Sequence, residues 1–221
     1  MAAVLAFPVL SLASTLAVTM LMGSDVVLVE HFFGGVRGGQ FSAVTVTCRA
    51  LFFAMGSVTF VLFPKVAARH ASSRGTKAMV AASVGIALVA ALAGLVGFTA
   101  AGPFILRTFS GRAYLAGADY IGWYALGMPL LAAVVMFSNT QQSLADLGLL
   151  WVLVPGTLLK PLLIVLFHES LLIVSVMSDV SIGALLVGMA VRYMLAERQL
   201  ELAAVTSRAV TPSAEPTGIV P

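Results

Sequence analysis

Residues 78–106 read AMVAASVGIALVAALAGLVGFTAAGPFIL, a stretch without a single charged side chain. A helix needs about 20 apolar residues to cross the hydrocarbon core of a bilayer, and this run is longer than that. Strands of an outer-membrane barrel alternate apolar and polar residues over about ten positions, whereas this run is continuous. The stretch therefore predicts a transmembrane helix, because a helix satisfies its own backbone hydrogen bonds.

Five further apolar runs share this character, and short polar gaps separate them. They extend over roughly 4–29, 40–63, 120–139, 149–167 and 171–191. Hydrophobic residues make up 60% of the 221 residues, charged residues make up 10%, and the mean hydropathy is +1.06. Because soluble domains carry about 25% charged residues, this composition argues against a soluble enzyme or binding module and points to the bilayer.

We therefore predict an all-α, polytopic membrane protein with one bundle of six transmembrane helices over residues 1–196. The chain becomes polar after Arg192, and residues 206–221 contain three prolines and no periodicity. Such a composition is typical of disordered segments. We expect residues 197–221 to form a polar, disordered cytoplasmic tail.

Basic residues in the gaps predict the orientation, since cytoplasmic loops are enriched in Lys and Arg. If the N-terminus is cytoplasmic, seven basic residues fall inside and three outside. The inside set is Lys65, Arg69, Arg74, Lys77, Arg192, Arg198 and Arg208, and the outside set is Arg37, Arg107 and Arg112. We expect a multi-pass protein of the plasma (inner) membrane with both termini in the cytoplasm. The basic residues are few and most of them lie in the gaps, so we expect no nucleic-acid partner.

Charged side chains inside the apolar runs are the candidate pathway residues, because an intramembrane charge is costly and usually faces a cavity or a partner. They are Asp25, Arg49, Lys160 and Asp179. Each also has a structural explanation. Asp25 can reach the headgroups, Arg49 can snorkel or form an ion pair, Lys160 can extend to an interface, and Asp179 can hydrogen-bond between helices.

Three prolines inside the runs predict kinks that can act as hinges, because proline removes a backbone donor. Pro129 lies in the fourth run, and Pro155 and Pro161 are expected to break the fifth. A charge beside a broken helix, such as Lys160 before Pro161, is typical of midplane sites in transporters.

Asn139 and Gln142 close the fourth run and mark either its cytoplasmic mouth or simply its end. The sequence contains no Walker loop, no G-x-S-x-G elbow and no His-Glu-x-x-His helix. Its histidines are in separate gaps. The sequence therefore predicts neither an enzyme, nor a metal site, nor a cofactor.

Several short motifs around the first two runs resemble a known family. They are GSDVVLVEHFF at 23–33, GQFSA at 39–43, CRALFF at 48–53 and VLFPKVA at 61–67. Together they look like the second half of a polysaccharide flippase of the multidrug/oligosaccharidyl-lipid/polysaccharide exporter superfamily. The resemblance covers about residues 8–70, and from there to about 196 only helix number and length agree.

The resemblance implies two six-helix lobes around a cavity that opens alternately to each side, with Asp25 and Arg49 at matching charged positions. This chain corresponds to one lobe, so a second six-helix lobe, from the same or a different chain, is an expected partner. The expected substrate is a lipid-linked saccharide, with Arg49 and Lys160 holding its pyrophosphate. Two alternatives stay open: a drug/cation antiporter of the same superfamily, and a truncated, non-transporting membrane partner.

Overall fold

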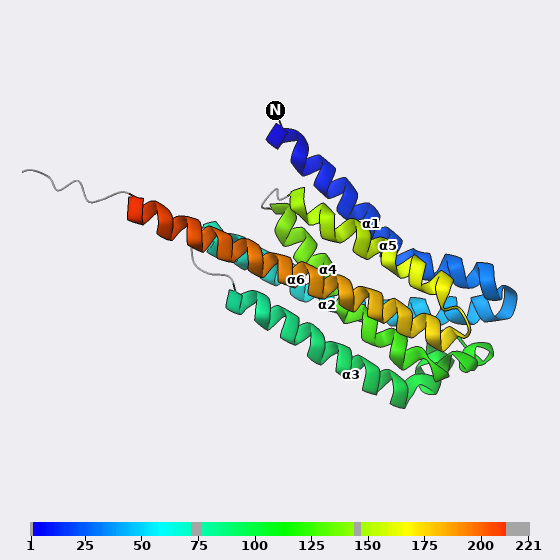
Figure 1. Ribbon diagram of the computed structural model, residues 1–221. Helices are drawn as coiled ribbons and strands as arrows, with labels where there is room; N and C mark the ends of the chain where they lie inside the picture. The colour runs from blue at the N-terminus through cyan, green and yellow to red at the C-terminus, as the bar shows by residue number, and fades with distance from the viewer. Residues whose placement is uncertain (1, 72–76, 144–146, 211–221) are drawn as a thin grey trace, which may run out of the picture. The chain divides into compact units, whose positions relative to one another are not determined.

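The computed structural model describes residues 2–71, 77–143 and 147–210, and all its elements are helical (Figure 1). The α-helices are α1 (Ala2–Phe33), α2 (Gly35–Ala71), α3 (Lys77–Phe109), α4 (Ile121–Ser143), α5 (Leu150–Leu166) and α6 (Leu171–Val210). Two 3₁₀ helices connect them, η1 (Arg112–Asp119) and η2 (Leu147–Leu149). No strand occurs within the described residues, which confirms the prediction of an all-helical chain.

Four of the described helices are long and apolar enough to cross a membrane. The qualifying segments are Pro8–Phe33 of α1, Val84–Phe109 of α3, Ile121–Asn139 of α4 and Leu171–Leu195 of α6. Helix α5 is apolar but shorter, and α2 is not among the four. The chain thus has the character of a membrane protein, while the expectation of six spans stays a prediction.

Helix α4 is the central element of the bundle. In its candidate span 83% is buried, against 17% in the candidate span of α3. It packs against α2 and α3, while α1 packs against α5 (Figure 1). Buried side chains from all six α-helices, and from Tyr120 just before α4, form the core around α4: Val29, Phe41, Val44, Cys48, Leu106, Tyr120, Ile121, Tyr124, Ala125, Met128, Ile164 and Val174. An apolar helix buried on most sides can hold polar groups only where neighbouring helices supply partners.

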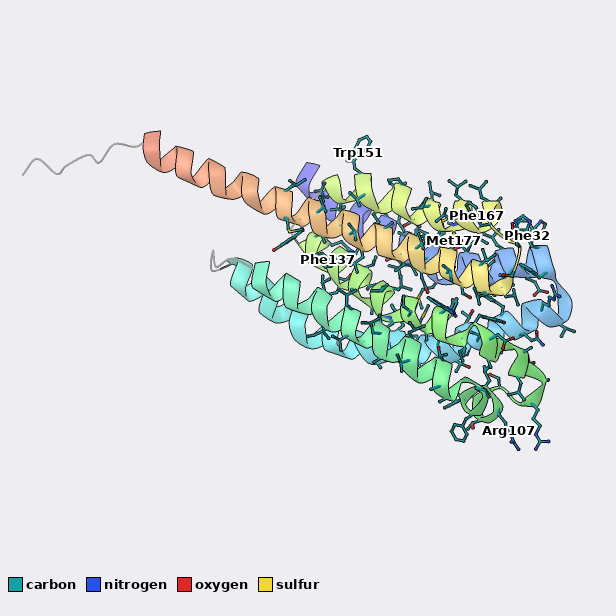
Figure 2. The ribbon with its side chains drawn as sticks, turned by 60° about the horizontal axis from the view of Figure 1, so that its bottom comes forward. Phe32, Arg107, Phe137, Trp151, Phe167 and Met177 are labelled. Atoms are coloured by element: carbon teal, nitrogen blue, oxygen red, sulfur yellow. The ribbon has the colours of Figure 1, made fainter. Side chains whose placement is uncertain are left out.

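The connection between α1 and α2 is very short because two glycines adopt positive φ angles. Gly34 has φ 57° and Gly35 has φ 45°, a region that side chains with a Cβ enter only at a cost. The end of α1 also meets the α5–α6 connection, where Phe32 stacks on His168 with ring centroids 4.2 Å apart. Figure 2 shows Phe32 and Phe167 close together at this end of the helices.

In two places helices extend into segments that the sequence-based expectation left outside them. Helix α6 continues to Val210, whereas we expected a disordered tail from residue 197. Residues 197–204, ERQLELAA, are mostly strong helix formers, which accounts for the extension. The gap between the predicted runs 40–63 and 78–106 is also shorter, since α2 ends at Ala71 and α3 begins at Lys77. Residues 72–76 and 211–221 are outside the described residues.

The chain forms two compact units, 1–189 and 190–221. The first contains the bundle described above. The second contains the C-terminal part of α6 and is a helix wherever it is described. All of the candidate site residues belong to the first unit.

The expected break of the fifth helix does not occur. Pro155 and Pro161 both lie inside one continuous helix, α5, and Pro129 lies inside α4. A proline removes one hydrogen bond of the helical ladder, and membrane helices tolerate this loss where neighbouring helices support the backbone. Lys160 therefore projects from an intact helix rather than from a broken one.

Candidate functional site: a buried charge cluster

Asp25 is the centre of the candidate site. It lies on α1 and has no exposed surface. Its Oδ2 accepts a hydrogen bond from the Tyr124 hydroxyl at 2.7 Å and lies 2.9 Å from the Lys160 ammonium. Its Oδ1 lies 3.0 Å from the backbone N–H of Val26. These three partners hold the Asp25 side chain inside the bundle.

Lys160 brings its charge to Asp25 from α5. The residue is 1% exposed, and its ammonium also donates to the backbone carbonyl of Leu21, one turn before Asp25 on α1. Burying two ions is costly, and their attraction repays the cost only when the geometry is good and further hydrogen bonds are made. Both conditions are met here. The pair has no net charge, and it joins α1 to α5.

Tyr124 is a site residue that the sequence interpretation missed. It lies on α4, is 2% exposed, and its ring packs edge-to-face on Phe41 with centroids 5.4 Å apart. A tyrosine in an apolar run is indistinguishable from an ordinary core residue. The only available signal is that a buried phenol hydroxyl generally needs a partner, and the sequence does not say which partner it finds.

Asp179 lies near this pair, on α6. The residue is 9% exposed, and its Oδ2 has no hydrogen-bond partner among the described residues. Its Oδ1 lies so close to Gly127 of α4 that a Cβ at that position would overlap it. Electrostatic interactions couple Asp179 to both Lys160 and Asp25. A residue with a side chain at position 127 would therefore displace this carboxyl group.

The serines around Asp179 face protein. Ser175, Ser178 and Ser181 are all buried. The Ser175 hydroxyl donates to the Leu171 carbonyl at 2.9 Å, and that of Ser181 donates to the Ser178 carbonyl at 2.7 Å. These bonds satisfy the Ser175 and Ser181 hydroxyls within α6, whereas the buried Ser178 hydroxyl has no hydrogen-bond partner among the described residues.

Arg49 takes a position different from the one that an ion pair with Asp25 would require. It lies on α2, is half-buried, and donates from Nη2 to the Met22 carbonyl of α1 at 2.7 Å. The ammonium that binds Asp25 is instead that of Lys160. Arg49 thus joins α2 to α1 through the backbone, one turn away from the charged pair.

Asn139 and Gln142 are not brought to the cluster. Both are half-buried residues in the last turns of α4. Asn139 is separated from Tyr124 by about 22 Å along the helix axis, from a rise of about 1.5 Å per residue. The structure therefore divides the predicted pathway residues into a central group and a group at the end of α4.

A separate cavity of about 500 Å³ lies where α1 ends and α2 begins. It is lined by Val26, Val27, Glu30, His31 and Ser42. No cluster of three or more His, Cys, Asp or Glu side chains that could hold a metal ion occurs within the described ranges.

Tyr120 precedes α4 at the end of η1 and is also buried. Burial raises the pKa of its phenol, and the neighbouring Asp119 carboxylate raises this pKa further. The Tyr120 hydroxyl therefore stays protonated at any physiological pH.

The central group is an ion pair with a second carboxyl group, enclosed by apolar helices. Charges interact strongly in such surroundings because little water screens them, so a shift of one helix, or one added charge, changes the energy of the whole group. A function for it has to be argued from the site itself. Comparison of the chain with known protein families, with curated proteins and with solved structures finds no match.

Proposed function

We propose that this chain is one lobe of a transporter that moves a lipid-linked saccharide across the plasma (inner) membrane for cell-surface polysaccharide synthesis. The observation that carries the proposal is the Lys160–Asp25 pair, 2.9 Å apart and buried among apolar helices. Ionisable groups inside membrane segments are costly and generally mark a substrate or ion pathway. The saccharide class is supported by the resemblance of residues 23–33 and 48–53 to polysaccharide flippases.

In this proposal the substrate competes with Asp25 for the Lys160 ammonium. A lipid pyrophosphate is anionic and would replace one carboxylate partner of Lys160 by another anion. Arg49 lies one turn away and can add a second donor, since a guanidinium suits phosphate oxygens. The lipid tail would pass along the exposed apolar faces of the helices. A second lobe completes the cavity, because one lobe cannot enclose it.

The transport prediction concerns a variant that removes both members of the pair. Asp25→Asn combined with Lys160→Met replaces two buried charges by neutral groups, so we expect the protein to accumulate. We expect the flipping of a fluorescent polyprenyl-pyrophosphate saccharide in proteoliposomes to fall to the level of protein-free vesicles. Protection of the fluorophore from an impermeant quencher measures flipping. Asp119→Asn, which alters an exposed carboxylate on η1, is the control and should flip normally.

Normal flipping by the double variant would remove the buried pair from the mechanism. The mass of the active particle in mild detergent tests the second lobe, because we expect two lobes in every active form. An active, strictly monomeric particle would contradict the two-lobe part of the proposal.

The proposed topology places six spans in the membrane, with both termini and the 65–77 segment in the cytoplasm. Single cysteines at Ser72 and Ser110, in a Cys48→Ala background, report it by labelling of intact cells with an impermeant thiol reagent. We expect labelling at Ser110 and none at Ser72 until the membrane is opened. The reverse pattern would overturn the orientation.

A drug/cation antiporter is the second candidate, and one observation favours it. The central group contains two carboxyl groups, Asp25 and Asp179, but only one ammonium, Lys160, so it can attract a further cation. A reconstituted wild-type protein that exchanges an organic cation for protons, and moves no lipid-linked saccharide, would support this candidate over the first.

A further inference from the structure

The buried cluster lacks one positive charge if all its acidic groups are ionised. Asp25 and Asp179 would carry two negative charges, whereas Lys160 supplies one positive charge, which it places on Asp25 at 2.9 Å. An uncompensated carboxylate in an apolar interior is so unfavourable that such a group takes up a proton instead. One further positive charge is therefore required near Asp179.

Among the residues that the structure describes, the groups that face this site do not supply that charge. The Cys48 thiol of α2 donates to the Ile121 carbonyl at 3.7 Å, and the Tyr124 hydroxyl of α4 donates to Asp25 at 2.7 Å. Both groups thus keep their protons and are neutral. The charges coupled to Asp179 are those of Lys160 on α5 and Asp25 on α1, while Arg49 of α2 donates to the Met22 carbonyl.

The surroundings of the Asp179 carboxyl group also fit a neutral acid. The residue is nine-tenths buried, and its Oδ2 has no hydrogen-bond partner among the described residues. An ionised carboxylate accepts several hydrogen bonds when it is buried, whereas a protonated acid needs fewer. The absence of a side chain at Gly127 leaves just enough room for Oδ1, so α4 holds the group beside the pair.

We propose that Asp179 is a proton-binding site: its carboxyl group is protonated at neutral pH because the single ammonium of Lys160 is committed to Asp25. This inference concerns the same cluster as the proposed function but does not depend on transport. When Asp25 loses its charge, the Lys160 ammonium becomes available to Asp179. The O–H bond of Asp179 then breaks, its proton passes to water, and Lys160 balances the new carboxylate.

Infrared spectroscopy of the purified full-length protein tests the proposal directly. A protonated carboxylic acid has a C=O stretch apart from the amide bands. We expect this band in the wild type at neutral pH, its loss in Asp179→Asn, and its persistence in the control Asp119→Asn. We also expect its loss in Asp25→Asn, because Lys160 then pairs with Asp179. Labelling of aspartate side-chain carboxyls with ¹³C should shift the band, and this measurement needs no variant.

Each result decides the matter. A wild type without the band at neutral pH, a band that survives in Asp179→Asn, or a band that aspartate labelling does not shift would overturn the proposal. Survival of the band in Asp25→Asn would overturn the sharing of one ammonium. A wild type that flips lipid-linked saccharide but lacks the band would overturn this inference alone. A wild type with the band but without transport would contradict only the proposed function.

Discussion

Replacement of Lys160 by methionine is expected to remove much of the folded protein from the membrane. The substitution keeps the length of the side chain but leaves the Asp25 carboxylate buried without its ammonium. Breaking a buried pair by removing one partner costs about 3–5 kcal/mol, which is a large part of the stability of an ordinary domain. Membrane abundance and the thermal unfolding midpoint in detergent measure the loss.

Removal of Asp25, the second member of the pair, provides the control for this prediction. Asp25→Asn combined with Lys160→Met removes the stranded charge, so abundance and midpoint should return most of the way to wild type. Arg107→Met removes a cation from the exposed end of α3 and should change stability by no more than about 0.5 kcal/mol. A single Lys160→Met variant with wild-type abundance and midpoint would show that the buried pair contributes nothing to stability.

Replacement of Arg49 by alanine is expected to destabilise the bundle through the backbone rather than through an acid. The substitution removes the guanidinium that donates to the Met22 carbonyl at 2.7 Å. A hydrogen bond that involves a charged group contributes about 1.5–3 kcal/mol. Arg49→Lys retains a charged donor without the planar fork and should recover part of the loss. The same abundance and midpoint measurements apply.

A double variant separates this role from an ion pair. If Arg49 were the partner of Asp25, Asp25→Asn would rescue Arg49→Ala. From the observed geometry we expect no rescue, because Asp25 has a different cation, Lys160. Recovery of abundance in the double variant would therefore contradict the arrangement of the cluster. Normal abundance and normal transport of Arg49→Ala would leave Arg49 without either role.

The class of the protein followed from the sequence because transmembrane helices are specified locally. Continuous apolar runs such as 78–106 predict helices by their length alone, and α3 extends over Lys77–Phe109. The ends of helices were predicted less well. Residues 197–210 looked like part of a disordered tail but belong to α6, and Pro155 and Pro161 looked like breaks but lie within α5. Local helix propensity extends α6, and neighbouring helices support α5 across its prolines. The polarity of the sequence does not reveal these two effects.

The sequence by itself determined which residues are unusual: Asp25, Lys160 and Asp179 stand out because charge is rare in apolar runs. Only the tertiary structure decided which of them meet. Asp25 and Lys160 are 135 positions apart, and their contact depends on α1 packing against α5. Tyr124 also contacts Asp25, because its hydroxyl on α4 lies next to the Asp25 carboxylate of α1. A charge inside an apolar run can be recognised from the sequence alone. The residue that compensates this charge lies on another helix, so only the packing of the helices identifies it.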